Sequence, residues 1–79
     1  MSLNKAFGEI LREIRKEAKI SQEELAELSN LDRSYISLLE RGIRQPTIHT
    51  IFSISQSLSI QPSVLIKKVE ERFFSTGEV

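Results

Sequence analysis

The sequence predicts an all-α domain of five helices, and two observations carry this prediction. Apolar residues recur three and four positions apart through most of the chain, which is the period of a helix with one buried face. Residues that favour helix ends separate these apolar segments, and no run shows the two-residue alternation of a strand. The 79 residues suffice for a single core, so we expect one domain over residues 1–79.

The first helix is expected from about Asn4 to Ala18. Its apolar stripe consists of Phe7, Ile10, Leu11, Ile14 and Ala18. Opposite charges lie three positions apart elsewhere on the helix, as with Glu9 and Arg12, and such pairs are typical of a solvated face. An amphipathic helix with one buried side is therefore predicted.

The second helix is predicted from the pair Ser21 and Glu24. This spacing is that of a capping box, in which each side chain can hydrogen-bond the backbone N–H of the other residue. The helix is expected over Gln22–Leu28, and Ser29-Asn30 then interrupt the helical pattern.

The third helix is expected over Arg33–Arg41, with Asp32 as its N-terminal cap and Gly42 at its end. Two short helices joined by a turn of about four residues form a helix-turn-helix arrangement. The second helix of such a pair can lie in the major groove of DNA with its N-terminal side chains on base edges.

The fourth helix is expected to begin at the cap Thr47 and to continue to about Leu58. Its apolar face consists of Ile48, Ile51, Phe52, Ile54 and Leu58. Pro62 suits the first turn of a fifth helix, which is expected to run to about Phe73. The tail Ser75–Val79 shows no pattern.

The composition narrows the functions that we expect. Lys and Arg total 11, as do Asp and Glu, so the formal net charge is zero, and there is no cysteine. Disulfides and zinc–thiolate sites are thereby excluded, and His49 has no second histidine beside it, so we expect no metal and no cofactor. No nucleophile–base pair or acid pair indicates an enzyme. No membrane-spanning run or secretory signal is found, so a cytoplasmic location is expected.

The residues around the predicted turn resemble a known family. The matching positions are Ser21, Gln22, Glu23, Leu25, Ala26, Leu31, Ile36, Leu39, Glu40 and Gly42, followed by Arg44-Gln45-Pro46-Thr47. They resemble the lambda-repressor-like helix-turn-helix proteins, a class of small bacterial and phage transcription factors, over about Phe7 to Leu65. Within that class, LDRSYISLLERGIRQPT looks most like the controller proteins of restriction-modification systems. Arg33, Tyr35 and Arg44 carry this finer resemblance.

The resemblance implies a lambda-repressor-like fold and a sequence-specific DNA-binding transcriptional regulator. It further implies a controller protein that binds its own promoter as a dimer. A phage-type repressor is one alternative, and the antitoxin or interaction module of a toxin-antitoxin pair is another. Neighbouring genes would distinguish these functions. The expected partners are operator DNA and a second copy of the chain, with no membrane and no small-molecule effector.

Five residues of the third helix are candidates for base contacts: Arg33, Ser34, Tyr35, Ser37 and Leu38. An arginine can donate two hydrogen bonds to guanine, and Arg33 stands at a helix start, where the helix dipole disfavours a cation. This placement favours a role in binding. The alternatives are a solvated Arg33, a Tyr35 partly buried against the second helix and an isolated exposed Leu38.

Four polar residues are candidates for phosphate contacts: Gln22, Arg44, Gln45 and Thr47. In the family, a glutamine at the position of Gln22 hydrogen-bonds a phosphate, and the N–H groups at the start of the fourth helix can bind a second one. The alternative is an exposed helix residue and an ordinary polar loop. Because the net charge is zero, we expect modest affinity for DNA of arbitrary sequence.

Two further features concern stability and assembly. In the family, a glutamate at the position of Glu40 pairs with an arginine at the position of Arg15, so a structural ion pair is expected. Ile66, Val69 and Phe73 add more apolar surface to the last helix than one narrow core stripe needs, which favours a dimer interface there. The alternative is a longer core that hides all of them.

Overall fold

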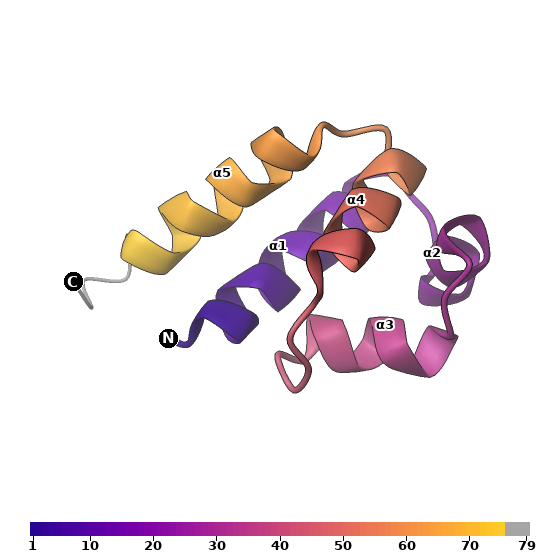
Figure 1. Cartoon of the computed structure of the whole chain (residues 1–79), viewed down its shortest axis with the longest axis horizontal. Helices are drawn as coiled ribbons and strands as arrows, with labels where there is room; N and C mark the ends of the chain where they lie inside the picture. Colours follow the sequence, from indigo (N-terminus) through magenta and orange to yellow (C-terminus); the bar gives the residue numbers. More distant parts are fainter. Residues whose placement is uncertain (76–79) are drawn as a thin grey trace.

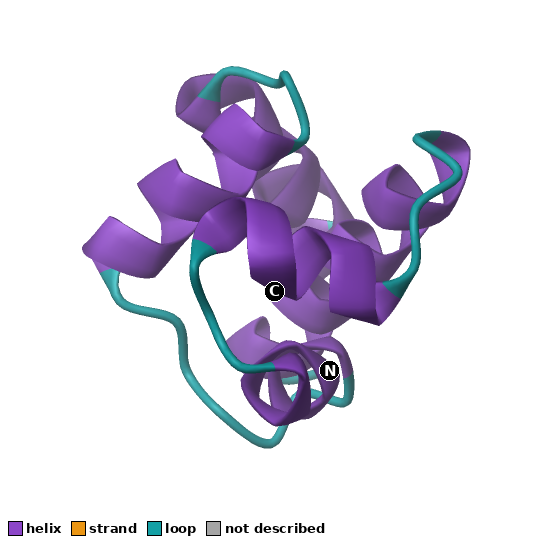
Figure 2. Cartoon of the chain, turned by 90° about the vertical axis from the view of Figure 1, so that its right-hand side faces the viewer, coloured by secondary structure: helices purple, strands orange, loops and turns teal. Residues whose placement is uncertain are grey.

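The computed structural model describes residues 1–75, which form five α-helices joined by short loops (Figure 1). The helices are α1 (Leu3–Glu17), α2 (Gln22–Ser29), α3 (Arg33–Glu40), α4 (Ile48–Ser57) and α5 (Pro62–Phe74). Figure 2 shows helices and loops but no strand over this part of the chain, so the all-α prediction is confirmed. Each predicted helix end lies within one residue of the observed one. Residues 76–79 of the predicted tail lie outside the described residues.

The start of α2 forms the predicted capping box. The backbone N–H of Glu24 donates to Ser21 Oγ at 3.0 Å, and the backbone N–H of Ser21 donates to Glu24 Oε1 at 2.9 Å. The prediction for Asp32 is only half right: it holds the N-cap position of α3, but its side chain makes no capping hydrogen bond. Because Asp32 is exposed, water can satisfy the N–H groups of that first turn.

The end of α3 depends on Gly42. Its φ of 74° is left-handed, which lets its N–H donate to the Leu39 carbonyl at 3.1 Å and that of Ile43 to the Leu38 carbonyl at 3.0 Å. A Cβ at this position would stand 2.9 Å from the Cα of Lys5, so the turn also fits closely against the start of α1. The predicted stop at Gly42 is confirmed.

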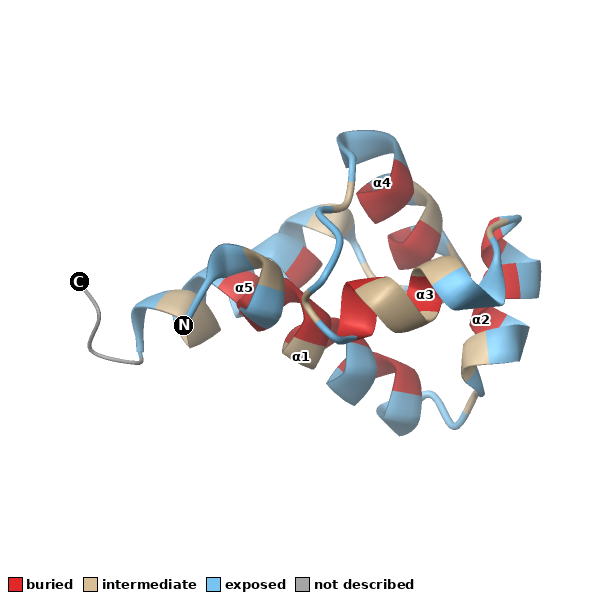
Figure 3. Ribbon diagram, turned by 90° about the horizontal axis from the view of Figure 1, so that it is seen from below, coloured by how far each residue is buried: buried red, intermediate tan, exposed pale blue. Residues whose placement is uncertain are grey.

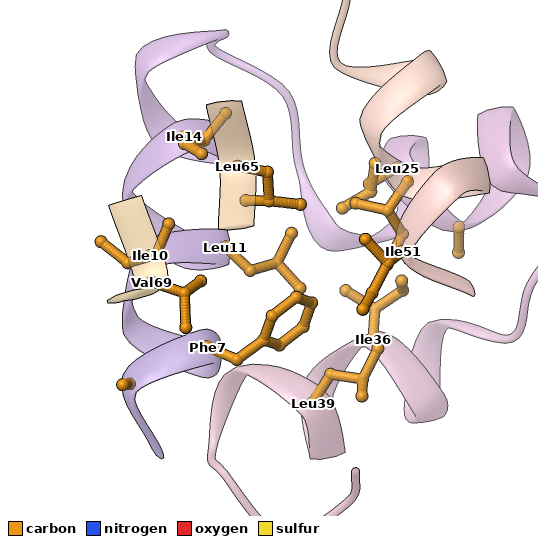
Figure 4. Close-up of a cluster of buried hydrophobic side chains, with 13 residues drawn as sticks. Phe7, Ile10, Leu11, Ile14, Leu25, Ile36, Leu39, Ile51, Leu65 and Val69 are labelled. Atoms are coloured by element: carbon orange, nitrogen blue, oxygen red, sulfur yellow. The ribbon is translucent and has the colours of Figure 1, made fainter. Parts of the chain in front are cut away.

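One core joins all five helices. Buried apolar side chains from each helix meet in its centre, among them Phe7, Leu11, Leu25, Ile36, Leu39, Ile51, Leu65 and Val69 (Figure 4). Helix α1 packs tightly on the end of α3 at Gly8. A Cβ at this position would lie only 2.5 Å from the Leu39 carbonyl oxygen, so only glycine fits here without a shift. This close crossing holds α3 against the body of the domain.

Three apolar residues that the sequence pattern assigns to the core are exposed in the structure. Ala18 is the exposed C-terminal cap of α1, beyond its last packed turn. Ile48 and Phe52 are 68% and 57% exposed, although Ile51 and Ile54 of the same helix are buried. The reason is that α4 packs through one side, and residues 48 and 52 lie four positions apart on the other.

The last helix packs along α1. Leu65 is fully buried as predicted, and Val69 is only 4% exposed. The assignment of Val69 to a dimer interface is therefore wrong, because the core of the monomer already covers it. Arg72 fastens the far end of α5 to α1 by donating to Glu9 Oε1 at 2.9 Å and to both oxygens of Glu13 at 2.9 and 2.8 Å.

Candidate nucleic-acid interface

Helices α2 and α3 meet through a short turn at residues 30–32. Asn30 takes a left-handed φ of 57°, and the N–H of Leu31 donates to the Ala26 carbonyl at 2.8 Å, which ends α2 and redirects the chain. Ile36 and Leu39 are fully buried and anchor α3 along one side. The opposite side of α3 is thereby turned outward.

The outward side of α3 is most exposed at its start. Figure 3 views the molecule from below and shows the first residues of α3 exposed and its last residues buried. Arg33 and Ser34 are exposed, whereas Tyr35, Ser37 and Leu38 are half-buried. All five candidates for base contact thus keep some accessible surface, and it is greatest in the first turn, the part of such a helix that contacts bases.

A hollow of about 500 Å³ runs beside α3 and draws two groups of candidates together. Its lining consists of Asn30, Leu31, Asp32, Ser34, Tyr35, Leu38 and Arg44. Ser34, Tyr35 and Leu38 were expected at bases and Arg44 at phosphate, and here they share one concave surface. Arg33 and Ser37 are not part of its lining.

Tyr35 contacts α4 through Thr50, a residue that no sequence motif marks. Its hydroxyl lies 3.4 Å from Thr50 Oγ1, and Thr50 is buried. Thr47 Oγ1 in turn donates to Thr50 Oγ1 at 3.0 Å and accepts from the Thr50 N–H at 3.1 Å. Tyr35 is thus partly buried, as one alternative expects, and it packs on the core and approaches α4. No pattern of spacing marks Thr50, because only the tertiary structure brings the hydroxyls of Tyr35 and Thr50 together.

The phosphate candidates lie at two helix starts. Gln22 is the half-buried first residue of α2, and Arg44, Gln45 and Thr47 are exposed in the segment before α4. The hydroxyl of Thr47 already caps α4, so what it can still offer a phosphate is its place beside the first N–H groups of that helix.

The expected pair of Arg15 and Glu40 is present and buried. Each residue is 9% exposed, and the guanidinium donates twice to the carboxylate, from Nε to Oε2 at 2.6 Å and from Nη2 to Oε1 at 3.1 Å. Arg15 Nη1 also donates to the Ile20 carbonyl at 2.9 Å. One side chain of α1 thus fixes both the loop that enters α2 and the last residue of α3.

Comparison with known families agrees with this geometry. The family model for the helix-turn-helix matches residues 11–65, a span that includes α2, α3 and α4. The chain belongs to the helix-turn-helix family. It is a DNA-binding regulator of transcription. None of the helices within residues 1–75 is long and apolar enough to cross a membrane.

Several of the proteins to which the chain is similar are controller proteins of restriction-modification systems. It is 43% identical to the control protein C.BamHI of Bacillus amyloliquefaciens, over 76% of this chain and 75% of that protein. The crystal structure of the controller protein C.AhdI from Aeromonas hydrophila matches with a TM-score of 0.77 and 44% identity, covering 78% of this chain and 94% of that one. A third match is C.Esp1396I, whose structure is that of a tetramer with its natural 35-base-pair operator. It has a TM-score of 0.84 and 32% identity, over 94% and 97% of the two chains.

Proposed function

We propose that the chain is a restriction-modification controller that binds its own promoter as a homodimer, with α3 in the major groove. The observation that carries this proposal is the exposed first turn of α3. Ile36 and Leu39 hold the helix against the core, which leaves Arg33 and Ser34 on the surface beside the hollow. This is the arrangement by which the second helix of a helix-turn-helix contacts base edges. Such a function needs binding to DNA and no catalytic step. A regulator that acts on its own promoter would work in the cytoplasm of a bacterium.

The five α3 residues would divide the work of recognition by their chemistry. Arg33 can donate two hydrogen bonds to guanine O6 and N7, and Ser34 and Ser37 can donate or accept one each. Leu38 can pack on a thymine methyl group. Tyr35 can reach sugar or phosphate, although its tie to Thr50 restricts its hydroxyl.

The phosphate contacts would flank α3 on two sides. Gln22 would hold one phosphate from the start of α2, while Arg44, Gln45 and the first N–H groups of α4 beside Thr47 would hold another. Glu23 and Glu24 lie in the first turn of α2 and lower the positive potential there, so the contact at Gln22 has to depend on geometry. Such contacts set the register of the protein on the duplex.

The structure offers two exposed apolar surfaces for a second copy. One is the outer side of α4 with Ile48 and Phe52, next to a hollow of about 500 Å³ at the α4–α5 corner, which Phe52, Ile60 and Pro62 help to line. The other is a groove of about 590 Å³ between the start of α1 and the end of α5. It is lined in part by Leu3, Ile66, Phe73 and Phe74.

Charge favours the α4 surface as the dimer interface. From Gln45 to Ile66 the chain has no Asp, Glu, Lys or Arg, although such residues make up 28% of the sequence. A two-fold interface brings identical residues of the two copies together. A charged residue near the axis would therefore lie beside a residue of the same charge and repel it. Phe52 also borders the corner hollow, which suits insertion of this ring from one copy into the hollow of the other. This location replaces the interface expected at Ile66, Val69 and Phe73.

A selection from randomised DNA tests the function directly. The purified chain is incubated with a library of random duplexes, bound duplexes are recovered over several rounds, and the enriched sequence is compared with the DNA upstream of its own gene. The proposal expects a near-palindromic site in that upstream DNA, with half-sites about 34–36 Å apart or in a related register. Enrichment of no sequence would refute specific binding, and a site found only elsewhere in the genome would refute control of its own promoter.

The neighbouring genes test the finer assignment. An adjacent endonuclease gene and methyltransferase gene would support the controller function, which here rests on similarity to the control proteins. A toxin gene in their place would support the antitoxin alternative.

A further inference from the structure

The buried ion pair of Arg15 and Glu40 extends to the surface through Gln22. Gln22 Nε2 donates to Glu40 Oε1 at 3.1 Å, and the same oxygen accepts from Arg15 Nη2 at 3.1 Å. We propose that Glu40, held by Arg15, is a positioning residue for DNA binding, because it orients the side-chain amide of Gln22 toward a phosphate. This inference rests on the phosphate contact of Gln22 in the proposed function.

The Glu40 carboxylate and a DNA phosphate both need a hydrogen-bond donor, and this allows the side-chain amide of Gln22 one orientation. A carboxylate only accepts hydrogen bonds, so the NH2 end of Gln22 has to face Glu40. A phosphate likewise needs a donor. The Nε2 atom carries two hydrogens, and since one is directed to Glu40, the other is available to a phosphate in a fixed direction. Without the carboxylate, the amide could rotate and present its oxygen, which a phosphate oxygen would repel.

The same network sets where that amide stands relative to α3. Arg15 Nη1 donates to the carbonyl of Ile20, directly before the N-cap of α2, and Glu40 is the last residue of α3. The guanidinium therefore connects the beginning of α2 with the end of α3. A glutamine that is ordered before DNA arrives also loses less conformational entropy on binding than a free one.

A pair that only stabilises the fold predicts a different behaviour. In that case, altering Glu40 would lower the free energy of unfolding and leave the affinity of the folded protein for DNA unchanged. If Glu40 acts through Gln22, the effects of changing the two residues on affinity overlap and do not multiply.

The test is a double-mutant cycle on DNA affinity. Wild type, Gln22→Ala, Glu40→Gln and the double variant are titrated by fluorescence anisotropy onto a labelled duplex of mixed sequence and onto the duplex recovered from the selection. Both duplexes report on the contact, because phosphate contacts do not depend on sequence. Circular dichroism first confirms that each protein is folded at the assay temperature.

We expect each single variant to weaken binding about threefold to tenfold, as for one hydrogen bond, and the double variant to bind as Gln22→Ala does. Glu23→Gln is the charge-matched control, since it removes the same negative charge from an exposed neighbouring residue. It should leave affinity unchanged or raise it, because a charge effect alone favours DNA. The inference about Glu40 would be overturned if Glu40→Gln bound DNA with wild-type affinity. It would also be overturned if the affinity losses of the two single variants multiplied in the double variant. In both cases Gln22 could still be a phosphate contact. Wild-type affinity of the Gln22→Ala variant would overturn both the positioning role of Glu40 and the phosphate contact of Gln22.

A second measurement covers the case in which Glu40→Gln does not fold. Glu40→Asp keeps the charge for Arg15 but withdraws the carboxylate from Gln22 by one methylene. Nuclear magnetic resonance relaxation of the Gln22 side-chain nitrogen, measured on the free protein, should show a rigid amide in wild type and a mobile one in Glu40→Asp. A mobile amide in the wild type would contradict the inference.

Discussion

The hydroxyl of Tyr35 on α3 lies 3.4 Å from Thr50 Oγ1 on α4, and this contact joins the proposed recognition helix to the helix that Thr47 caps. Thr47 lies beside the proposed second phosphate site, so the contact connects the helix proposed to contact bases with the helix start proposed to bind a phosphate. The separation is near the upper limit for a hydrogen bond, which indicates a weak interaction.

This geometry separates two roles of Tyr35. Tyr35→Phe keeps the ring in its half-buried place and removes only a weak hydrogen bond, so we expect the free energy of unfolding to fall by less than about 1 kcal/mol. Urea denaturation measures this change, and anisotropy titration on the selected duplex measures affinity. An affinity loss much larger than the loss for Thr50→Val would place the hydroxyl on DNA. Equal small losses for both variants would mean that Tyr35 acts by packing.

Arg33→Ala should remove sequence preference and spare most of the general affinity. The side chain is exposed in the first turn of α3, and a bidentate arginine–guanine contact contributes about 1–3 kcal/mol of discrimination. Gel shifts on the selected and a scrambled duplex should show the preference for the selected one fall by roughly tenfold or more. If both affinities drop by the same factor, Arg33 contacts phosphate. Arg41→Ala is the matched control, an exposed arginine at the opposite end of the helix.

Removing either partner of the buried ion pair should destabilise the fold strongly. Arg15 and Glu40 are each 9% exposed, so Arg15→Ala or Glu40→Ala leaves a charge with little access to water, at a cost of about 3–5 kcal/mol. The double alanine variant should be more stable than the sum of the single losses predicts, because no orphan charge remains. Thermal and urea unfolding of the four proteins measures this coupling. Additive losses would show that the pair does not form in solution.

Phe52→Asp should produce a folded monomer. Phe52 is 57% exposed on the side of α4 that faces away from the core, so a carboxylate there stays hydrated in the monomer but meets its copy across a two-fold axis. Analytical ultracentrifugation reports the state, and affinity for the full palindrome should fall much more than affinity for a half-site. Phe74→Asp is the control, since Phe74 is 51% exposed but lines the other groove. Dissociation by Phe74→Asp and not by Phe52→Asp would return the interface to α5.

Local patterns were enough to predict the helices of this chain. The capping box of Ser21 and Glu24, the left-handed Gly42 and the first-turn Pro62 act within a few residues of themselves, so their effect does not depend on the remaining chain. The exposed start of α3 was predictable on the same grounds, because Ile36 and Leu39 leave only one side of that helix for solvent. The resemblance to a family added the pairing of Arg15 with Glu40, which spacing alone does not contain.

The tertiary structure decided what each apolar or polar side chain meets. Val69 and Phe52 are both apolar residues at helical spacing, yet α1 and the core cover Val69 while Phe52 stays 57% exposed. Likewise, Gln22 contacts Glu40, and Tyr35 approaches Thr50, only because consecutive helices fold back on one another at those points. Helical periodicity tells which residues share a side of one helix, whereas burial depends on the number of neighbouring helices that pack on that side. The amino-acid sequence by itself therefore determined the helices and the exposed side of α3. The packing of the helices decided which apolar residues stay exposed for the proposed dimer interface, and it formed the hydrogen bond between Gln22 and Glu40.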